Sequence, residues 1–137
     1  MIDPFSKTKF HPDLRLETWH PTGVLDFALA TQIVNHVGFE ERVLDEPFNR
    51  FADLSGITEI HLNFKMLSDL AAERRAAYAS RPPVKSAFLA TTAASFAISG
   101  MFASLRQESS VEVRIFRDIN SAAEWLGVPA QSLREVT

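Results

Sequence analysis

FNRFADLSGITEIHLN, residues 48–63, is the stretch that decides the fold. Its first part, Phe48 to Leu54, is short, partly aromatic and free of proline, which is typical of an interior strand of a parallel sheet. Gly56 then permits a turn, and a strong helical pattern runs from about Leu62 to Ala79. The stretch therefore predicts a strand, a turn and a helix in succession.

Short extended runs and longer helical runs alternate along the rest of the chain. This alternation indicates an α/β domain, and we expect a single-layer, mostly parallel sheet of about four to five strands with about four helices packed on it. The predicted strands are 14–19, 48–54, 84–90 and 111–116, and the helices after the first are 62–79, 95–107 and 121–126. We expect an extended lead-in over residues 1–13 and a loose tail over residues 129–137.

The first predicted strand alternates Leu14, Leu16 and Thr18 with Arg15, Glu17 and Trp19. A period of two favours a half-buried strand at a sheet edge. A turn at Pro21-Thr22-Gly23 precedes the first helix, which ends before Pro47. Asp26 can cap this helix, because its carboxylate accepts hydrogen bonds from amides of the first turn. Gly38 predicts a kink or break. The buried stripe is predicted to be Ala30, Ile33, Val34 and Val37, and the solvated residues Glu40, Glu41 and Arg42.

Local signals also shape the later helices. Lys65 and Asp69 are four residues apart, so they can form an ion pair on the solvated side of the second helix. Pro82-Pro83 ends that helix, since proline has no amide hydrogen. Ser95 can cap the third helix.

The composition excludes several classes of protein. A length of 137 residues indicates one domain, residues 1–137. The net charge of −3 argues against a nucleic-acid partner, because contacts with phosphates require a basic patch. Without cysteine, the chain has no disulfides or thiolate metal sites. We recognise no signal peptide or membrane-spanning segment and expect a cytoplasmic protein.

No catalytic motif stands out, so we expect no enzyme activity, no cofactor and no metal. The five glycines are too far apart for a phosphate-binding loop or a dinucleotide fingerprint, and Ser55 is not in a nucleophile elbow. A hydrolase with Ser55 as nucleophile and His61 as base is a less favoured hypothesis, beside the two binding functions given at the end of this section. His36 and Glu40 suit a two-ligand metal clip, but the sequence nominates no third ligand.

Polar residues follow the predicted parallel strands, at the ends where α/β proteins bind ligands. The candidate residues for binding a ligand or a partner are Asp53, Ser55, Thr58, His61, Asn63, Thr91 and Asp118, with Thr92 and Asn120 beside them. The alternative interpretation is that these residue types only cap helices and form turns.

The third predicted helix is apolar nearly all round. A helix on a sheet normally has one apolar stripe. Either this helix is buried on several sides, or it presents an exposed apolar face to a partner, a lipid or a membrane surface. That candidate face consists of Ile98, Met101, Phe102 and Leu105.

Four segments together resemble the bacterial SpoIIAA-like proteins, whose fold is shared with STAS domains: PFNRFADLSG, PPVKSAFLA, VEVRIFRD and SAAEWLGV. The resemblance spans about Leu14 to Val128. It implies a sheet covered by helices and a non-enzymatic binding or regulatory role. The serine that a kinase phosphorylates in anti-sigma factor antagonists would fall near His61 to Phe64, where this chain has no serine. SpoIIAA-like proteins also resemble a class of lipid-binding domains.

Two functions follow as hypotheses. The first is a SpoIIAA/STAS-like regulatory module that binds a protein partner without the usual phosphoacceptor serine. The alternative is a protein that binds a small apolar ligand, a lipid or a membrane surface through its third helix. A homodimer is compatible with either function.

Overall fold

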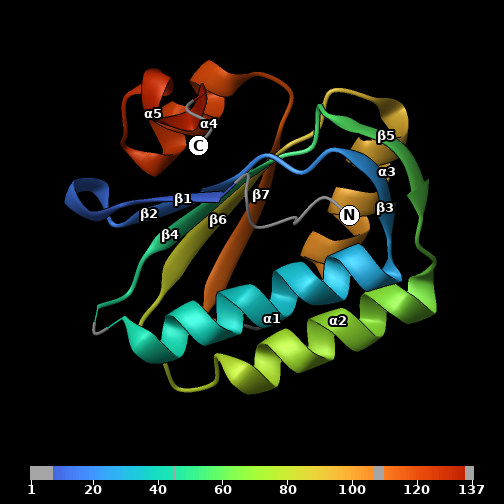
Figure 1. The fold of residues 1–137 in the computed structure, drawn as a ribbon, viewed down its shortest axis with the longest axis horizontal. Coiled ribbons are helices and arrows are strands. Elements are labelled where there is room, and N and C mark those ends of the chain that lie inside the picture. The colour runs from blue at the N-terminus through green and yellow to red at the C-terminus, as the bar shows by residue number, and fades with distance from the viewer. Residues whose placement is uncertain (1–7, 45, 107–109, 135–137) are drawn as a thin grey trace.

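The computed structural model describes residues 8–44, 46–106 and 110–134. A five-stranded sheet has the order β1-β2-β4-β6-β7, formed by β1 (Thr8–His11), β2 (Leu16–Trp19), β4 (Asn49–Asp53), β6 (Val84–Leu89) and β7 (Val111–Phe116). β1 runs antiparallel to β2, and every other pair is parallel (Figure 1). The predicted α/β fold with a mostly parallel sheet is confirmed, and β4 is its central strand.

Five α-helices cover the two faces of this sheet. They are α1 (Phe27–Val43), α2 (Phe64–Ala77), α3 (Ala93–Leu105), α4 (Ile119–Leu126) and α5 (Ala130–Arg134). Figure 1 shows α4 and α5 on one face and α1, α2 and α3 on the other. No α-helix within the described ranges has the length and apolarity needed to cross a membrane.

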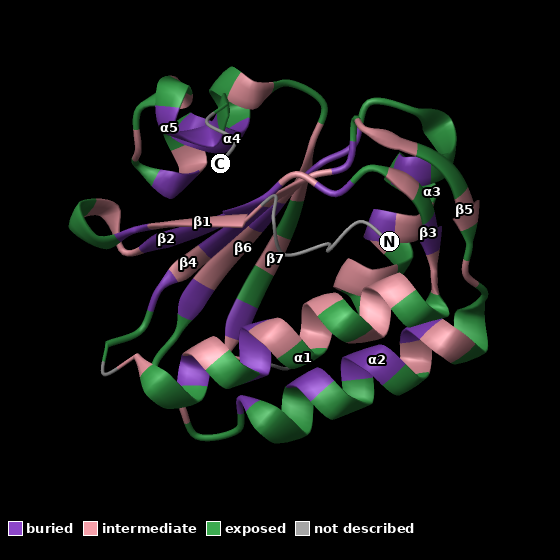
Figure 2. Ribbon diagram, viewed as in Figure 1, coloured by how far each residue is buried: buried purple, intermediate pink, exposed green. Residues whose placement is uncertain are grey.

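The face under α4 and α5 is tightly packed. Its core consists of Leu16, Phe51, Ala87, Leu89, Ala122, Ala123, Leu126 and Leu133. Strand residues alternate between the two faces, so the neighbours of these core residues point toward α1, α2 and α3. On that second face α1 is mostly half-buried or exposed, and only Val37, Gly38 and Glu41 of this helix are buried (Figure 2).

Two short strands missed in the sequence form a separate parallel pair, β3 (Gly23–Asp26) and β5 (Ile57–His61). Both strands follow tight turns and have only four or five residues. An alternation of apolar and polar residues over so short a length is too weak to predict a strand. The turns lie against each other, with Gly23 N donating to Gly56 O at 3.1 Å. A Cβ on Gly56 would lie 2.9 Å from Pro21 O, which explains the glycine by close backbone approach.

The ends of the chain are more regular than expected. Part of the predicted lead-in is β1, followed by the 3-10 helix η2 (Pro12–Leu14), while residues 1–7 lie outside the described residues. β1 is the sheet edge, so the prediction of an edge strand at 14–19 was wrong: all four residues of β2 are buried. The predicted tail contains α5, which packs Leu133 into the core, and residues 135–137 are not described.

The helix predictions were right about several caps and wrong about one break. Asp26 caps α1, accepting from Leu29 N at 2.9 Å, and Lys65 pairs with Asp69 at 3.1 Å. α1 runs unbroken through Gly38, because packing against α2 outweighs the weak helix propensity of one glycine. Thr92, rather than Ser95, caps α3, and the two side chains form a reciprocal capping box.

Candidate functional site

A cavity of about 160 Å³ lies between the sheet and the three helices α1, α2 and α3. Its sheet side is formed by alternate residues of β2, β4 and β6, of which Trp19, Ala52 and Phe88 are apolar. Ala52 and Ser86 are small residues on the central strands, so they leave room that larger side chains would fill. The hollow therefore results from the choice of side chains on this face.

The helices supply the other walls. Ile33, Val34 and Val37 come from α1, and Leu67 and Leu70 come from α2. The predicted apolar stripe of α1 thus lines a cavity instead of packing directly on the sheet. This explains why most of that stripe is only half-buried.

The candidate apolar face of α3 divides into two parts. Ile98 and Phe102 line the cavity, and the Phe102 ring meets the Phe88 ring edge-on at 6.1 Å. Met101 is 37% exposed, and Leu105 is half-buried away from the cavity lining. The inward side of α3 also carries the buried Ser95 and Ser99, which is why its apolar residues surround the axis. The sequence therefore indicated Ile98 and Phe102, which do line the cavity. It was wrong to group them with Met101 on a single exposed face.

Three arginines interrupt the apolar lining: Arg50, Arg74 and Arg106. Glu41 Oε2 accepts hydrogen bonds from Arg50 Nη2 at 2.6 Å and from Arg74 Nη2 at 2.5 Å. One carboxylate is therefore shared by two buried guanidinium groups. Burial, followed by repulsion from Arg74 and Arg50, lowers the pKa of Arg106 to about 10. This part of the wall has a positive potential.

Glu41 was wrongly predicted to be solvated. It is 6% exposed, because it lies one helical turn after Val37 and faces the same way, toward β4 and α2. Burial also lowers the pKa of Arg50, and the Glu41 carboxylate opposes that shift. Arg50 stacks on the rings of Phe48 and Tyr78, at 4.6 and 5.0 Å. The sequence did contain a signal for this burial, because Glu41 lies four residues after Val37 and so continues the apolar stripe. The signal was missed because Glu41 is a charged residue.

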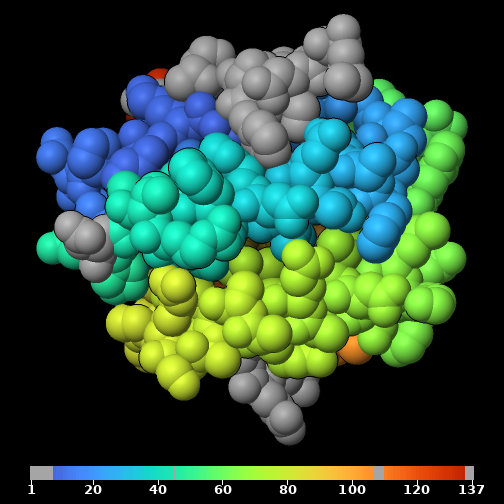
Figure 3. Space-filling model, turned by 60° about the horizontal axis from the view of Figure 1, so that its bottom comes forward, coloured from blue at the N-terminus to red at the C-terminus, as the bar shows by residue number. Residues whose placement is uncertain are grey.

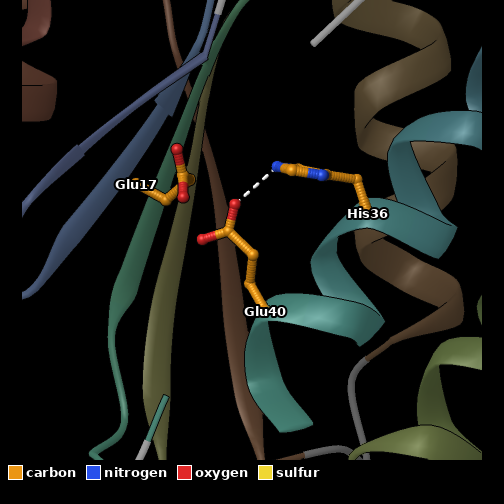
Figure 4. Close-up of side chains that lie close together, drawn as sticks. All are labelled: Glu17, His36 and Glu40. Carbon is orange, nitrogen blue, oxygen red and sulfur yellow. Dashed lines mark ion pairs between the residues drawn. The ribbon is translucent and has the colours of Figure 1, made fainter. Parts of the chain in front are cut away.

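A second polar group lies where α1 faces β2. Glu17 of β2 and His36 and Glu40 of α1 point toward one another, and one ligand atom from each lies within 4.8 Å of the others (Figure 4). His36 Nε2 is 2.5 Å from Glu40 Oε1. Glu17 is 1% exposed, and burial raises its pKa to about 9, with the hydrogen bond and the charge of Glu40 adding to the shift.

The sequence paired His36 with Glu40 and missed Glu17. The missed signal was Trp19, because a large apolar residue on the expected solvent face of the strand indicates that this face is covered. Glu17 shares that face and is therefore turned toward α1. The Trp19 ring also contacts the His36 ring edge-on at 6.4 Å, so Trp19 lies between the cavity and this polar group.

Most of the predicted polar site residues have local structural roles. Asp53 accepts from Ser55 N at 2.9 Å, Asn63 caps α2 through Met66 N at 2.9 Å, and Asp118 caps α4 through Ser121 N at 2.8 Å. The pKa of Asp118 is lowered by its hydrogen bonds with Ser121.

The remaining predicted residues do not gather around one point. Thr58 and His61 are exposed on β5, and Thr91 is exposed after β6. His61 lies 3.9 Å from Glu59, and no hydrogen bond in the described part of the chain joins it to Ser55. Asp53, Thr91 and Asp118 do lie at the carboxyl ends of adjacent strands, as expected, yet no hydrogen bond or ion pair joins them within residues 8–44, 46–106 and 110–134.

Comparison with known protein families and with curated proteins finds no family model and no curated protein that matches this chain.

Proposed function

We propose that this chain is a non-enzymatic, SpoIIAA/STAS-like binding protein whose ligand is a small apolar molecule with an anionic end. The observation that carries the proposal is the cavity under α1, α2 and α3, with its apolar lining and its arginine-bearing wall. Native cores rarely leave hollows larger than a water molecule. A hollow with apolar walls and a few charged groups is the usual form of a small-molecule site.

The volume sets the size of the buried part of the ligand. An engineered apolar cavity of about 150 Å³ in another protein binds benzene, so about six heavy atoms fit in a cavity of this size. Burying five or six methylene groups at about 0.8 kcal/mol each contributes roughly 4–5 kcal/mol. A charge-assisted hydrogen bond adds about 1.5–3 kcal/mol. Together these gains of roughly 5.5–8 kcal/mol would correspond to a Kd of about 1–100 µM, and the cost of association weakens this, so a millimolar Kd is expected.

The arginines set the charge of the ligand. Arg50 and Arg74 share one carboxylate, so a second anion beside them would be attracted. A carboxylate is the simplest such group. Hexanoate is therefore a suitable probe, and hexan-1-ol is its uncharged match with the same chain.

The test is titration of the purified protein with hexanoate and with hexan-1-ol, followed by calorimetry and by NMR amide shifts. Hexanoate should bind more tightly than the alcohol, and Arg106→Met should remove most of this difference. Ala52→Leu and Ser86→Val fill the cavity, so both should weaken binding while leaving the melting temperature equal or higher. Met101→Ser, on the exposed side of α3, is the control and should bind as the wild type does.

Equal binding by the filled variants, or no binding of either probe at millimolar concentration, would exclude this function. Native mass spectrometry of the freshly purified protein adds an independent readout, since a co-purified carboxylate would be released by Ala52→Leu. Partner binding through Asp53 to Asn63 stays a prediction, because the residues of that stretch chiefly cap α2 and stabilise a turn.

A further inference from the structure

The cluster of Glu17, His36 and Glu40 brings two carboxylates and an imidazole together from two elements. His36 and Glu40 are four residues apart on α1, so they project side by side from one helix face. Glu17 reaches them from β2, on the opposite wall of the layer (Figure 4). An imidazole and two carboxylates are all common ligands of divalent transition metals.

An independent observation at the same place is the state of the Glu17 side chain. Glu17 is 1% exposed, and its Oε1 atom has no hydrogen-bond partner among the described residues. A buried polar atom without a partner is unfavourable, so a site for an ion or another ligand is one explanation that such an atom calls for. The carboxyl group that carries this atom lies beside Glu40 and His36, as Figure 4 shows.

We propose that Glu17, His36 and Glu40 form a binding site for one divalent transition-metal ion such as Zn²⁺. As ligands of a bound ion, two ionised carboxylates and a neutral imidazole would carry a charge of −2, which a divalent cation neutralises. The ion would bind one carboxylate oxygen of Glu17 and one of Glu40 and would compensate their charges. This site is separate from the proposed ligand cavity and does not depend on it.

The geometry suits such an ion. Zn–N and Zn–O distances are about 2.0–2.2 Å, so two ligand atoms of one ion lie at most about 4.4 Å apart. The three ligand atoms here all lie within 4.8 Å of one another. Small rotations of the glutamate side chains are enough to close that difference, and the helix fixes the two ligands of α1 relative to each other.

The site also has an entry path and a rigid surround. The side chains of His36 and Glu40 are 21% and 16% exposed, so the path from solvent to the cluster is short on the α1 side. Three protein ligands leave room for a water molecule or another ligand at a fourth position. Trp19 contacts the imidazole edge-on and limits its rotation, which is the effect that outer-shell groups have at known metal sites.

The test is calorimetric titration of chelator-treated protein with Zn²⁺. Wild type should bind one ion per chain, and its melting temperature should rise with Zn²⁺ concentration. Glu17→Gln and His36→Gln should each weaken Zn²⁺ binding by at least about 100-fold, the upper range for loss of an outer-shell group. Glu17→Gln keeps the side-chain shape, so its melting temperature in chelator shows directly whether it folds.

His61→Gln is the matched control, since His61 also lies beside a glutamate but on the exposed strand β5. It should bind Zn²⁺ as the wild type does. Stoichiometric binding that survives Glu17→Gln, or that is lost in His61→Gln, would overturn the assignment. So would a wild type that binds no Zn²⁺, which would mean that Glu17 and Glu40 simply share a proton.

Discussion

Replacing Glu41 by glutamine should strongly destabilise the fold, because Glu41 is the carboxylate that two buried arginines share. Its Oε2 accepts from Arg50 Nη2 at 2.6 Å and from Arg74 Nη2 at 2.5 Å. The three side chains are only 3%, 7% and 5% exposed for Glu41, Arg50 and Arg74. Glutamine keeps the shape but not the charge, so two guanidinium groups would stay buried beside each other without compensation.

Breaking a buried ion pair by removing one partner costs about 3–5 kcal/mol. For a domain of this size, each kcal/mol lowers the melting temperature by roughly 3–4 °C, so a drop of roughly 10–20 °C is expected. Urea denaturation followed by circular dichroism gives the free energy of unfolding directly. The loss should persist at high ionic strength, because salt screens buried charges much less than exposed ones.

Glu46→Gln provides the matched control. Glu46 pairs with Arg15 at 3.4 Å, but its side chain is 71% exposed. Exposed pairs contribute about 0–1 kcal/mol, so this variant should unfold close to the wild type. If Glu41→Gln lost no more free energy than Glu46→Gln, the charges around the cavity would be compensated in another way, and the reasoning about its positive wall would be wrong.

Two further changes test local features of the fold. Gly56→Ala should cost about 1–3 kcal/mol in urea denaturation, because its Cβ would lie 2.9 Å from both Pro21 O and Thr22 Cγ2; Gly100→Ala on α3, which has open space, should be neutral or stabilising. Asp118→Asn should destabilise at pH 7 but not in strong acid: hydrogen bonds from Ser121 lower the pKa of Asp118, so its contribution is present above its ordinary pKa of about 3.9 and is lost as the pH falls through the lowered value. A difference between wild type and Asp118→Asn that stayed constant across this range would contradict the assignment of the charged cap.

The strands and helices with strong local patterns could be predicted from the sequence. β4 is short, aromatic and free of proline, and Asp26 marks the start of α1 by simple local chemistry. The end of α2 was predicted less well, because this helix ends at Ala77, before Pro82-Pro83 is reached. β3 and β5 could not be predicted, because their pairing depends on two turns that meet only in the folded chain. The low helix propensity of glycine predicted a break at Gly38, but α1 is continuous there because tertiary packing outweighs that propensity.

The candidate sites were harder to predict, because both depend on which strand face each helix covers. Ile98 and Phe102 were found from their spacing, but a cavity also needs the small side chains of Ala52 and Ser86 opposite them. His36 and Glu40 were found by helical spacing, yet the third group, Glu17, is brought in by β2. The capping residues Asn63 and Asp118 were read as ligand-binding residues because the same chemistry serves both purposes.

The two faces of the sheet differ in a way that bears on function. The face under α4 and α5 buries Phe51, Ala87 and Leu133 in continuous apolar contact, whereas the opposite face contains the hollow. The layer between that opposite face and its helices also buries the ionisable side chains Glu17, Glu41 and Arg50. Apolar residues in their place would pack at least as stably, since buried ion pairs are often no better than hydrophobic replacements. The face under α4 and α5 can therefore supply most of the stability of the fold. The face under α1, α2 and α3 can then remain partly polar and incompletely packed, as a binding site between the sheet and these helices requires.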